Sequence, residues 1–421
     1  MNNLTFSIIT PTNGSKYLIE LWNSIKINID NYDIEWILLF NNISKDDSLQ
    51  FISDEIRTHK SIKIYYTNNE TKIGALKNQA FNLASGDILI EVDHDDMITE
   101  DIFDELSKAF SDPEIGFVHS DDAKLHMNGE FIPYNKNYGW DGYYTYNYNG
   151  QKLKVMKAFD ADSGSMSFIY YMPNHVRAWR SSVYHLVGGH DVSLDILDDH
   201  DLLVKTYLVT KFCHIKKPLY IYRIHGENTW LKNTDRIRTL GKELFNKYGR
   251  KLAERDAELN NKLLVDIGGG IDRREGYISM DLYDGDIIAD LNNTFPLEDN
   301  SVGVLNASHV IEHLKDPVHT MKEIHRVLCD GGWVFIDAPS TDGRGAWQDP
   351  THVSFWNQNS FWYYTRKTQA RYIRNTTIRF QEFRLETIFP NNWYKENNIP
   401  VVRAWLRAIK SDKRRPHHIY I

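Results

Sequence analysis

Short apolar runs alternate with segments of helical spacing along the first part of the chain. The apolar runs end in turn residues or acids, and the helical segments repeat apolar positions every three or four residues. This alternation predicts an α/β fold. The predicted strands are residues 5–9, 34–40, 62–66 and 87–92, and helices are predicted for residues 72–84 and after Thr99.

The same pattern restarts after a polar, charged stretch near residue 250. That stretch offers few apolar positions to bury, so it is interpreted as a connecting helix or linker. A strand and a glycine turn follow, and a second α/β unit of ordinary domain size is expected after them. The basic end of the chain is interpreted as a solvated terminal helix. The predicted division is residues 1–245 for the first domain, 246–261 for the linker, 262–390 for the second domain and 391–421 for the basic tail.

Composition narrows the class of protein. A chain of 421 residues is expected to form two domains, and 42% hydrophobic with 25% charged residues is typical of soluble globular proteins. The net charge of −8 argues against a protein that coats nucleic acid. Cys213 and Cys329 lie far apart, which indicates a reducing compartment and no zinc site. We find neither an N-terminal signal nor an apolar run long enough to span a bilayer, so a soluble, cytoplasmic protein is expected.

The fourth predicted strand ends in a cluster of acids. Its apolar residues give way to Asp93, Asp95 and Asp96, which surround His94. Acids resist burial unless something pairs with them, and ligands of open α/β sheets bind beyond the carboxyl ends of the strands. Carboxylates two residues apart could therefore converge on Mg²⁺ or Mn²⁺, which would bridge them to a diphosphate. Turn and helix-capping roles are the alternative, because aspartate favours both.

Other motifs accompany this strand end in a fixed order. Together they resemble the family-2 glycosyltransferases of the GT-A fold, over residues 1–245. Nucleotidyltransferases, the rival class for this fold, tend to carry a glycine-rich basic loop after the first strand, whereas residues 11–16 contain one glycine. The matched motifs are Pro11-Thr12, Gly74 with Lys77-Asn78, the Asp93-x-Asp95-Asp96 strand end, Gly188-Gly189 with Asp191, Asp198-Asp199 with Asp201, and Tyr222-Arg223 with His225.

The resemblance implies a role for each matched residue. Asp93 and Asp95 would hold Mn²⁺ or Mg²⁺ on the diphosphate of a nucleotide-sugar donor, with His225 as a further metal ligand. Asp199 would deprotonate the hydroxyl of a glycan acceptor, which then displaces the diphosphate with inversion of the anomeric carbon. Lys77 would contact the diphosphate. The donor site is expected to comprise Pro11, Thr12, Asn41, Gly74, Lys77 and Asp93.

Asn41 departs from the family pattern, which places an aspartate there to accept an N–H of the nucleotide base. An amide oxygen can accept one such hydrogen bond, so uracil and thymine both stay open. Asp198 and Asp201 could raise the pKa of Asp199 through like charge, or they could form an acidic first helical turn. The aromatic stretch 138–148 is a candidate acceptor loop, with an ordinary packing insert as the alternative.

The second domain begins with a strand that runs into three consecutive glycines, Gly268 to Gly270. Glycines there let the backbone approach a ligand closely. Asp281, at the end of the next strand, is placed to accept hydrogen bonds from a ribose diol, and Asp290 suits an adenine edge. These motifs and several later segments occur in an order that resembles the class I S-adenosylmethionine-dependent methyltransferases over residues 262–365. The following segments are Glu312-His313-Leu314, Asp316-Pro317, Arg326-Val327-Leu328 and Gly331-Gly332.

This second resemblance implies S-adenosyl-L-methionine as cofactor. Gly269 stands where the family often has cysteine or another small residue. His313 or His352 could deprotonate a sugar hydroxyl, with a structural role as the alternative. The two resemblances together predict a bifunctional enzyme that transfers a sugar and O-methylates it; a non-catalytic second domain and a hydroxylated DNA base as acceptor are the alternatives. The expected cofactor contacts are Asp266, Gly268 and Gly270 to the methionine part, Asp281 to the ribose and Asp290 to the adenine.

Overall fold

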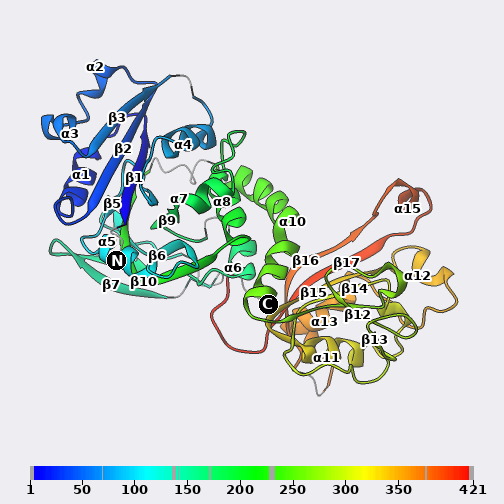
Figure 1. The fold of residues 1–421 in the computed structure, drawn as a ribbon. Coiled ribbons are helices and arrows are strands. Elements are labelled where there is room, and N and C mark those ends of the chain that lie inside the picture. The colour runs from blue at the N-terminus through cyan, green and yellow to red at the C-terminus, as the bar shows by residue number, and fades with distance from the viewer. Residues whose placement is uncertain are drawn as a thin grey trace. The chain divides into compact units, whose positions relative to one another are not determined.

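The computed structural model describes residues 4–68, 70–134, 139–140, 142–169, 172–226, 233–374 and 377–416. The chain divides into two compact α/β units (Figure 1), the first formed mainly by residues 1–249 and the second mainly by residues 250–421. None of the helices within the described ranges is both long and apolar enough to cross a membrane.

Ten strands of the described chain form one mixed sheet in the first unit. They are β1 (Thr5–Thr12), β2 (Asp33–Asn41), β3 (Ile62–Thr67), β4 (Ile88–Glu91), β5 (Met97–Ile98), β6 (Ile115–His126), β7 (Tyr143–Tyr148), β8 (Gln151–Met156), β9 (Arg177–Arg180) and β10 (Lys211–Ile224). The main path runs β3-β2-β1-β4-β9-β6-β10-β5, and the β7–β8 hairpin joins it at β6. The four strands predicted from the sequence are thus confirmed as β1 to β4.

Helices connect these strands and bury their apolar sides. Strands β1, β2 and β4 are buried along almost their whole length, as is usual for parallel strands that are covered on both faces. The helices of this unit are α1 (Leu18–Lys26), α2 (Lys45–Ser48), α3 (Asp54–Thr58), α4 (Ile73–Phe81), α5 (Ile102–Ala109), α6 (Ser163–Phe168), α7 (Ser181–Leu186) and α8 (Asp198–Tyr207). A further helix, α10 (Thr234–Leu259), spans the division between the units.

The strand order places the polar strand ends side by side. β1 pairs in parallel with β2 on one side and with β4 on the other. The carboxyl ends of these three strands, which carry Thr12, Asn41 and the acids after Glu91, therefore lie at one edge of the sheet. This edge is where an α/β sheet binds its ligands.

The second unit is a seven-stranded sheet within the described residues, in the order β13-β12-β11-β14-β15-β17-β16. From β13 to β15 this is the strand order of the doubly wound, nucleotide-binding sheet, and β17 enters it antiparallel to both of its neighbours. Both units therefore have the predicted α/β class. The strands are β11 (Leu263–Ile267), β12 (Ile278–Asp281), β13 (Ile287–Ile288), β14 (Val302–Ser308), β15 (Leu328–Pro339), β16 (Phe380–Ile388) and β17 (Val401–Ala408).

The helices of the second unit complete its core. Apolar residues of α11 and α13 pack with the strands in one hydrophobic cluster. The helices and 3-10 turns are η2 (Gly270–Asp272), η3 (Ile311–His313), α11 (Pro317–Val327), α12 (Gly345–Gln348), α13 (Gln358–Thr365), α14 (Lys367–Ala370) and α15 (Asn392–Glu396).

The two expectations about the connecting segments fare differently. The segment 246–261, predicted as a linker helix, lies mostly in the second half of α10, where Leu252 and Ala257 are buried. The prediction of a solvated helix in the tail 391–421 is wrong, because β17 lies there between β15 and β16. The inward residues of β17 alternate with Arg403 and Arg407, as the side chains of a strand do. The basic residues suggested a solvated helix and obscured this strand alternation.

A buried histidine in α8 gives the first unit a measurable pH dependence. His200 is fully buried, and burial lowers its pKa to about 4. An unfolded histidine titrates near 6.5, so the unfolded chain binds more protons as the pH falls through that value. His200 therefore contributes stability above about pH 6.5 that is lost on acidification.

We predict that His200→Phe reduces this loss. Between pH 7.5 and pH 5, the free energy of unfolding of the variant should fall by about 2 kcal/mol less than that of the wild type. Denaturant unfolding of the full chain at the two pH values, followed by tryptophan fluorescence, measures the difference. Leu203→Met, a buried change without a titratable group, is the control and should keep the wild-type dependence. Equal losses in His200→Phe and the wild type would contradict the prediction.

Candidate active sites of the two units

The acidic turn after β4 is anchored from β10. The backbone N–H of Asp93 donates to the hydroxyl of Tyr220 at 3.1 Å. Asp96 is buried, and its carboxylate accepts hydrogen bonds from the Tyr220 hydroxyl at 2.8 Å and from the backbone N–H of Arg223 at 2.7 Å. Asp96 thus fixes the path of the turn, which leaves Asp93 and Asp95 as the acids available to a ligand.

The structure brings together two of the three predicted metal ligands. Oδ2 of Asp95 lies 2.7 Å from Nε2 of His225. Burial raises the pKa of Asp93 to about 7; the charges of Glu91 and Asp95 act in the same direction, and that of Lys77 opposes them. A divalent cation beside these groups would stabilise the ionised carboxylates. Their chemistry therefore fits the predicted Mn²⁺ or Mg²⁺.

Asn41 offers an acceptor at the nucleotide end of the predicted donor site. Its side chain is buried, and Nδ2 donates to the backbone carbonyl of Glu70 at 2.8 Å. Oδ1 has no hydrogen-bond partner among the described residues. The amide is thus oriented with its acceptor available, as the predicted contact with a base N–H requires.

The remaining predicted donor residues lie at or near the same sheet edge. Pro11 and Thr12 end β1, and Oγ1 of Thr12 is 2.9 Å from Nδ1 of His94. Gly74 begins α4 close to the backbone of Asp191, since a Cβ at Gly74 would lie 2.1 Å from that residue's carbonyl oxygen. Packing alone therefore requires this glycine, and its contact with a donor stays a prediction.

Lys77 is held by two buried acids. Its Nζ lies 2.6 Å from Oε1 of Glu91 and 3.5 Å from Oδ2 of Asp198, and all three side chains are nearly inaccessible to solvent. The ion pairs join α4, β4 and the start of α8. Lys77 thus has structural partners of its own, and the predicted contact with a diphosphate stays a prediction.

Asp199, the predicted base, is paired with Arg177. One guanidinium nitrogen of Arg177 lies 2.7 Å from Oδ2 of Asp199. Burial alone would raise the pKa of Asp199, but the charges of Arg177 and Lys77 outweigh it and lower that pKa to about 2. The expectation that neighbouring acids raise this pKa is therefore wrong. Asp198 behaves differently, since burial raises its pKa to about 6.

Glu91 and Arg177 were missed in the sequence analysis although they organise this site. They are paired across the antiparallel strands β4 and β9, and both are almost fully buried. The signal was a charged residue at one end of each of two buried strands: Glu91 is the last residue of β4 and Arg177 is the first residue of β9. A buried charge needs a buried partner, so each of these residues indicated the other.

The candidate acceptor loop 138–148 is only partly described. Tyr138 and Asp141 lie outside the described residues. Trp140 is buried and packs edge-on against Phe159 with ring centroids 4.8 Å apart, and the rest of the stretch forms β7. These contacts favour the packing alternative for Trp140, and an acceptor role of the loop stays a prediction.

The glycine turn of the second unit faces Asp281. Gly268 and Gly270 have φ values of +70° and +47°, which side chains rarely allow. A Cβ at Gly268 would lie 2.3 Å from Val310, and one at Gly270 would lie 3.7 Å from Oδ2 of Asp281. The other oxygen of Asp281 accepts the backbone N–H of Tyr283 at 2.9 Å. This cradle fits the predicted ribose and methionine contacts of S-adenosylmethionine.

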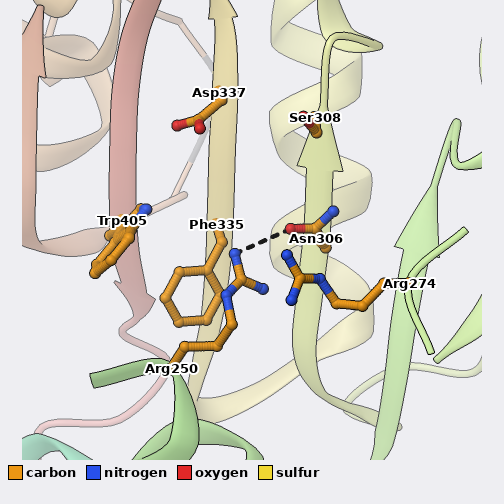
Figure 2. Close-up of a pocket in the computed structure, with 7 residues that line it drawn as sticks. All are labelled: Arg250, Arg274, Asn306, Ser308, Phe335, Asp337 and Trp405. Carbon is orange, nitrogen blue, oxygen red and sulfur yellow. Dashed lines mark hydrogen bonds between the residues drawn. The ribbon is translucent and has the colours of Figure 1, made fainter. Parts of the chain in front are cut away.

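Asp266 belongs to a polar network beside a pocket of the second unit (Figure 2). Oδ1 of Asp266 accepts Nδ2 of Asn306 at 2.7 Å, and Oδ1 of Asn306 accepts a guanidinium N–H of Arg250 at 3.1 Å. The guanidinium of Arg250 also lies 4.0 Å from the ring centroid of Phe335. Asp266 is 3% exposed, so its carboxylate mainly orients the residues that it contacts, such as Asn306. The pocket is lined by Arg250, Arg274, Asn306, Ser308, Phe335, Asp337 and Trp405.

The other predicted residues of this unit lie farther along the sheet edge. Asp290 is exposed, and Oδ1 accepts the backbone N–H of Asn292 at 2.9 Å. His313 and His352 lie together with their ring centroids 4.9 Å apart. The structure therefore pairs the two histidines that were predicted as alternative bases.

Comparison with known proteins assigns a class to each unit. Residues 7–168 match the family model of glycosyl transferase family 2, and residues 271–336 match that of a methyltransferase domain. The chain therefore joins a family-2 glycosyltransferase domain to a methyltransferase-like domain.

Individual relatives match about half of the chain. Chondroitin synthase of Escherichia coli is 25% identical over 231 residues, which are 54% of this chain and 30% of that protein. Hyaluronan synthase of Pasteurella multocida is 23% identical over 227 residues, which are 54% of this chain and 21% of that protein. The chain thus spans 30% or less of the length of these relatives. A crystal structure of Staphylococcus aureus TarS with UDP-GlcNAc superposes with a TM-score of 0.43 at 17% identity, covering 61% of this chain and 73% of that one.

We predict that Lys77→Met destabilises the first unit strongly, because it leaves the buried Asp198 without Lys77 and leaves Glu91 with Arg177 alone, at 3.8 Å. The free energy of unfolding should fall by about 3–5 kcal/mol. The double variant with Glu91→Gln should recover part of this loss, since one of these buried negative charges is then gone. Denaturant unfolding measures both effects.

The control for this experiment is Lys108→Met, which removes a largely exposed ion pair with Glu105. It should lie within about 1 kcal/mol of the wild type. If Lys77→Met costs no more than this control, the buried ion pairs do not stabilise the unit.

Proposed function

We propose that the first unit transfers a sugar from a nucleotide-sugar to a hydroxyl of a glycan acceptor, with a divalent cation on the donor diphosphate. The observation that carries this proposal is the pairing of Asp95 with His225 at 2.7 Å, in the turn that Asp93 opens at the sheet edge that also bears Asn41. The family match and relatives named for chondroitin and hyaluronan synthesis support it.

The residues divide the chemistry between them. Asp93 and Asp95 would hold the cation, which would supply positive charge to the leaving diphosphate. Asp199 takes the proton of the acceptor hydroxyl, and Arg177 keeps its carboxylate ionised and oriented. Attack from the face opposite the diphosphate inverts the anomeric carbon. Asn41 accepts the N–H of the base.

We propose further that the second unit binds S-adenosyl-L-methionine and O-methylates a sugar. The cradle at Gly268, Gly270 and Asp281 supports the cofactor. When bound, this cofactor supplies an electrophilic methyl group. Trp347 and Phe355 stack with ring centroids 4.3 Å apart, and their exposures are 60% and 44%. An exposed aromatic pair so near His352 in the chain suits the C–H face of a sugar ring.

The donor site is tested by thermal unfolding of the full chain with a panel of nucleotide-sugars, each with and without Mn²⁺. One donor should raise the midpoint only with the metal, because ligands that bind the folded state stabilise it by mass action. We predict that Asp95→Asn loses this metal-dependent shift. Asp54→Asn, an exposed acid of α3, is the control and should keep it. A shift that is independent of metal, and unchanged in Asp95→Asn, would contradict the metal site.

Asp199→Asn separates binding from chemistry in the same assay. We predict that it keeps the donor-dependent shift but lowers the transfer rate roughly 10²–10⁴-fold, the usual contribution of a positioned base. Transfer to an oligosaccharide acceptor, measured by mass spectrometry, gives the rate. Activity at the wild-type level in this variant would exclude Asp199 as the base.

Calorimetric titration with S-adenosylmethionine tests the second unit. We predict measurable binding by the wild type and an affinity at least tenfold lower for Asp281→Asn, since the ribose loses an acceptor. Asp284→Asn, an exposed neighbour, is the control. Wild-type protein that binds neither S-adenosylmethionine nor S-adenosylhomocysteine would favour the non-catalytic alternative for this unit.

A further inference from the structure

Three side chains beside the proposed cofactor cradle form a group of metal-ligating type. Glu312 and His313 belong to η3, directly after β14, and His352 follows α12. One ligand atom from each of the three lies within 4.8 Å of the other two. Two ligands of a single zinc ion stand roughly 3 to 4 Å apart, given bonds of about 2.1 Å. The three side chains are therefore within reach of one ion.

The backbone holds these residues together independently of their side chains. The backbone N–H groups of Val353 and Ser354 donate to the carbonyl of Glu312 at 2.9 and 3.0 Å. The hydroxyl of Ser354 donates to the carbonyl of Ile311 at 2.9 Å. The turn that carries His352 is thus fastened to η3, and the three ligands are positioned by the fold.

Both histidines present the same nitrogen. Nδ1 of His352 lies 3.0 Å from the carbonyl oxygen of Ala346, and Nδ1 of His313 lies 3.2 Å from that of Thr351. A carbonyl oxygen can only accept a hydrogen bond, so Nδ1 is the protonated ring nitrogen of each histidine. The lone pair of each imidazole is then on Nε2, where it can bind a metal. Hydrogen bonds from the second ring nitrogen to backbone carbonyls are typical of metal-binding histidines.

One of the two carboxylate oxygens of Glu312 lacks a hydrogen-bond partner within the described part of the chain. Its side chain is nearly inaccessible, and Oε2 has no hydrogen-bond partner among the described residues. The other oxygen lies 3.6 Å from Nδ1 of His309, whose backbone has a φ of +52°. A buried, unpaired carboxylate oxygen is costly unless a cation or a donor reaches it. A metal ion held also by His313 and His352 would meet this need.

We propose that Glu312, His313 and His352 bind a divalent transition-metal ion of the zinc type. Two imidazoles and one carboxylate suit such an ion, whereas Mg²⁺ prefers oxygen ligands alone. Three protein ligands leave at least one coordination position for water or substrate. The expectation of no zinc site, drawn from the cysteines, did not consider these ligands. His313 and His352 are then ligands rather than bases.

The ion would act on the hydroxyl that receives the methyl group. Val310, which the glycine turn contacts, lies two residues before Glu312, so the ion and the cradle share one sheet edge. A bound ion lowers the pKa of the hydroxyl. The acceptor oxygen bonds to the methyl carbon, the carbon–sulfur bond breaks with its electron pair on sulfur, and the hydroxyl proton passes to water. This role rests on the proposed methyltransferase function; binding of the ion does not.

Cobalt provides a direct readout of the site. Full-length protein carrying Asp93→Ala and Asp95→Ala, which removes the proposed site of the first unit, is freed of metal with a chelator and titrated with Co²⁺. We expect visible absorption bands from one bound ion with nitrogen ligands. Glu312→Gln and His352→Ala should each weaken Co²⁺ binding at least tenfold. His319→Ala, a histidine of α11 outside the group, is the control and should leave the bands unchanged.

The possible results of these experiments distinguish the metal site, the methyltransferase function and the role of the ion in methyl transfer. Bands that persist in both Glu312→Gln and His352→Ala overturn the metal site. Circular dichroism and S-adenosylmethionine affinity, measured on the same variants, establish that they are folded. Protein with Asp93→Ala and Asp95→Ala that binds Co²⁺ through Glu312 and His352 but does not bind S-adenosylmethionine overturns the methyltransferase function while the metal site stands. Methyl transfer that is unchanged after metal removal overturns the role of the ion in the reaction.

Discussion

The first unit depends on charges that neutralise one another beneath the carboxyl end of β4. Glu91 and Arg177 face each other across β4 and β9, Lys77 reaches Glu91 from α4, and Asp199 reaches Arg177 from α8. Burying any one of these charges without a partner would be energetically costly. Removing one of them therefore leaves its partner as an unpaired buried charge. The residues proposed for chemistry therefore stand on elements that the ion pairs hold in register.

The two units treat buried acids in opposite ways. In the first unit, protein cations already occupy the neighbourhood of Glu91 and Asp199, and the acids left for an external cation are those of the turn after β4. In the second unit, the described residues leave one oxygen of Glu312 without a partner and aim two imidazole nitrogens toward the same place. The first site is stabilised by the protein's own cations, whereas the proposed metal ion would complete the second.

The sequence predicted the fold class of both units because their strands have simple patterns. Strands β1 to β4 are short runs that end in turn residues, and the acids after β4 lie at the sheet edge that they share with the ends of β1 and β2, as the sequence indicated. It did not predict β17, since Arg403 and Arg407 obscure the alternation of Val402, Ala404 and Leu406. It also failed to find the partners of Asp199 and Lys77, because pairing between distant strands and helices depends on tertiary packing and leaves no local periodicity. His313 and His352 were recognised singly, but their tautomers follow from the backbone carbonyls near them.

The position of β17 has a consequence for the order in which the protein can fold. The described strands of the first unit lie within residues 5–224, so its sheet can close while later residues are still being synthesised. In the second unit, β17 follows every other described strand in the sequence, yet it lies between β15 and β16. Until residues 401–408 have left the ribosome, β15 has an open edge and β16 has no neighbour in the sheet. An apolar edge of this kind invites pairing with other chains, so the second unit is the part that needs protection during synthesis.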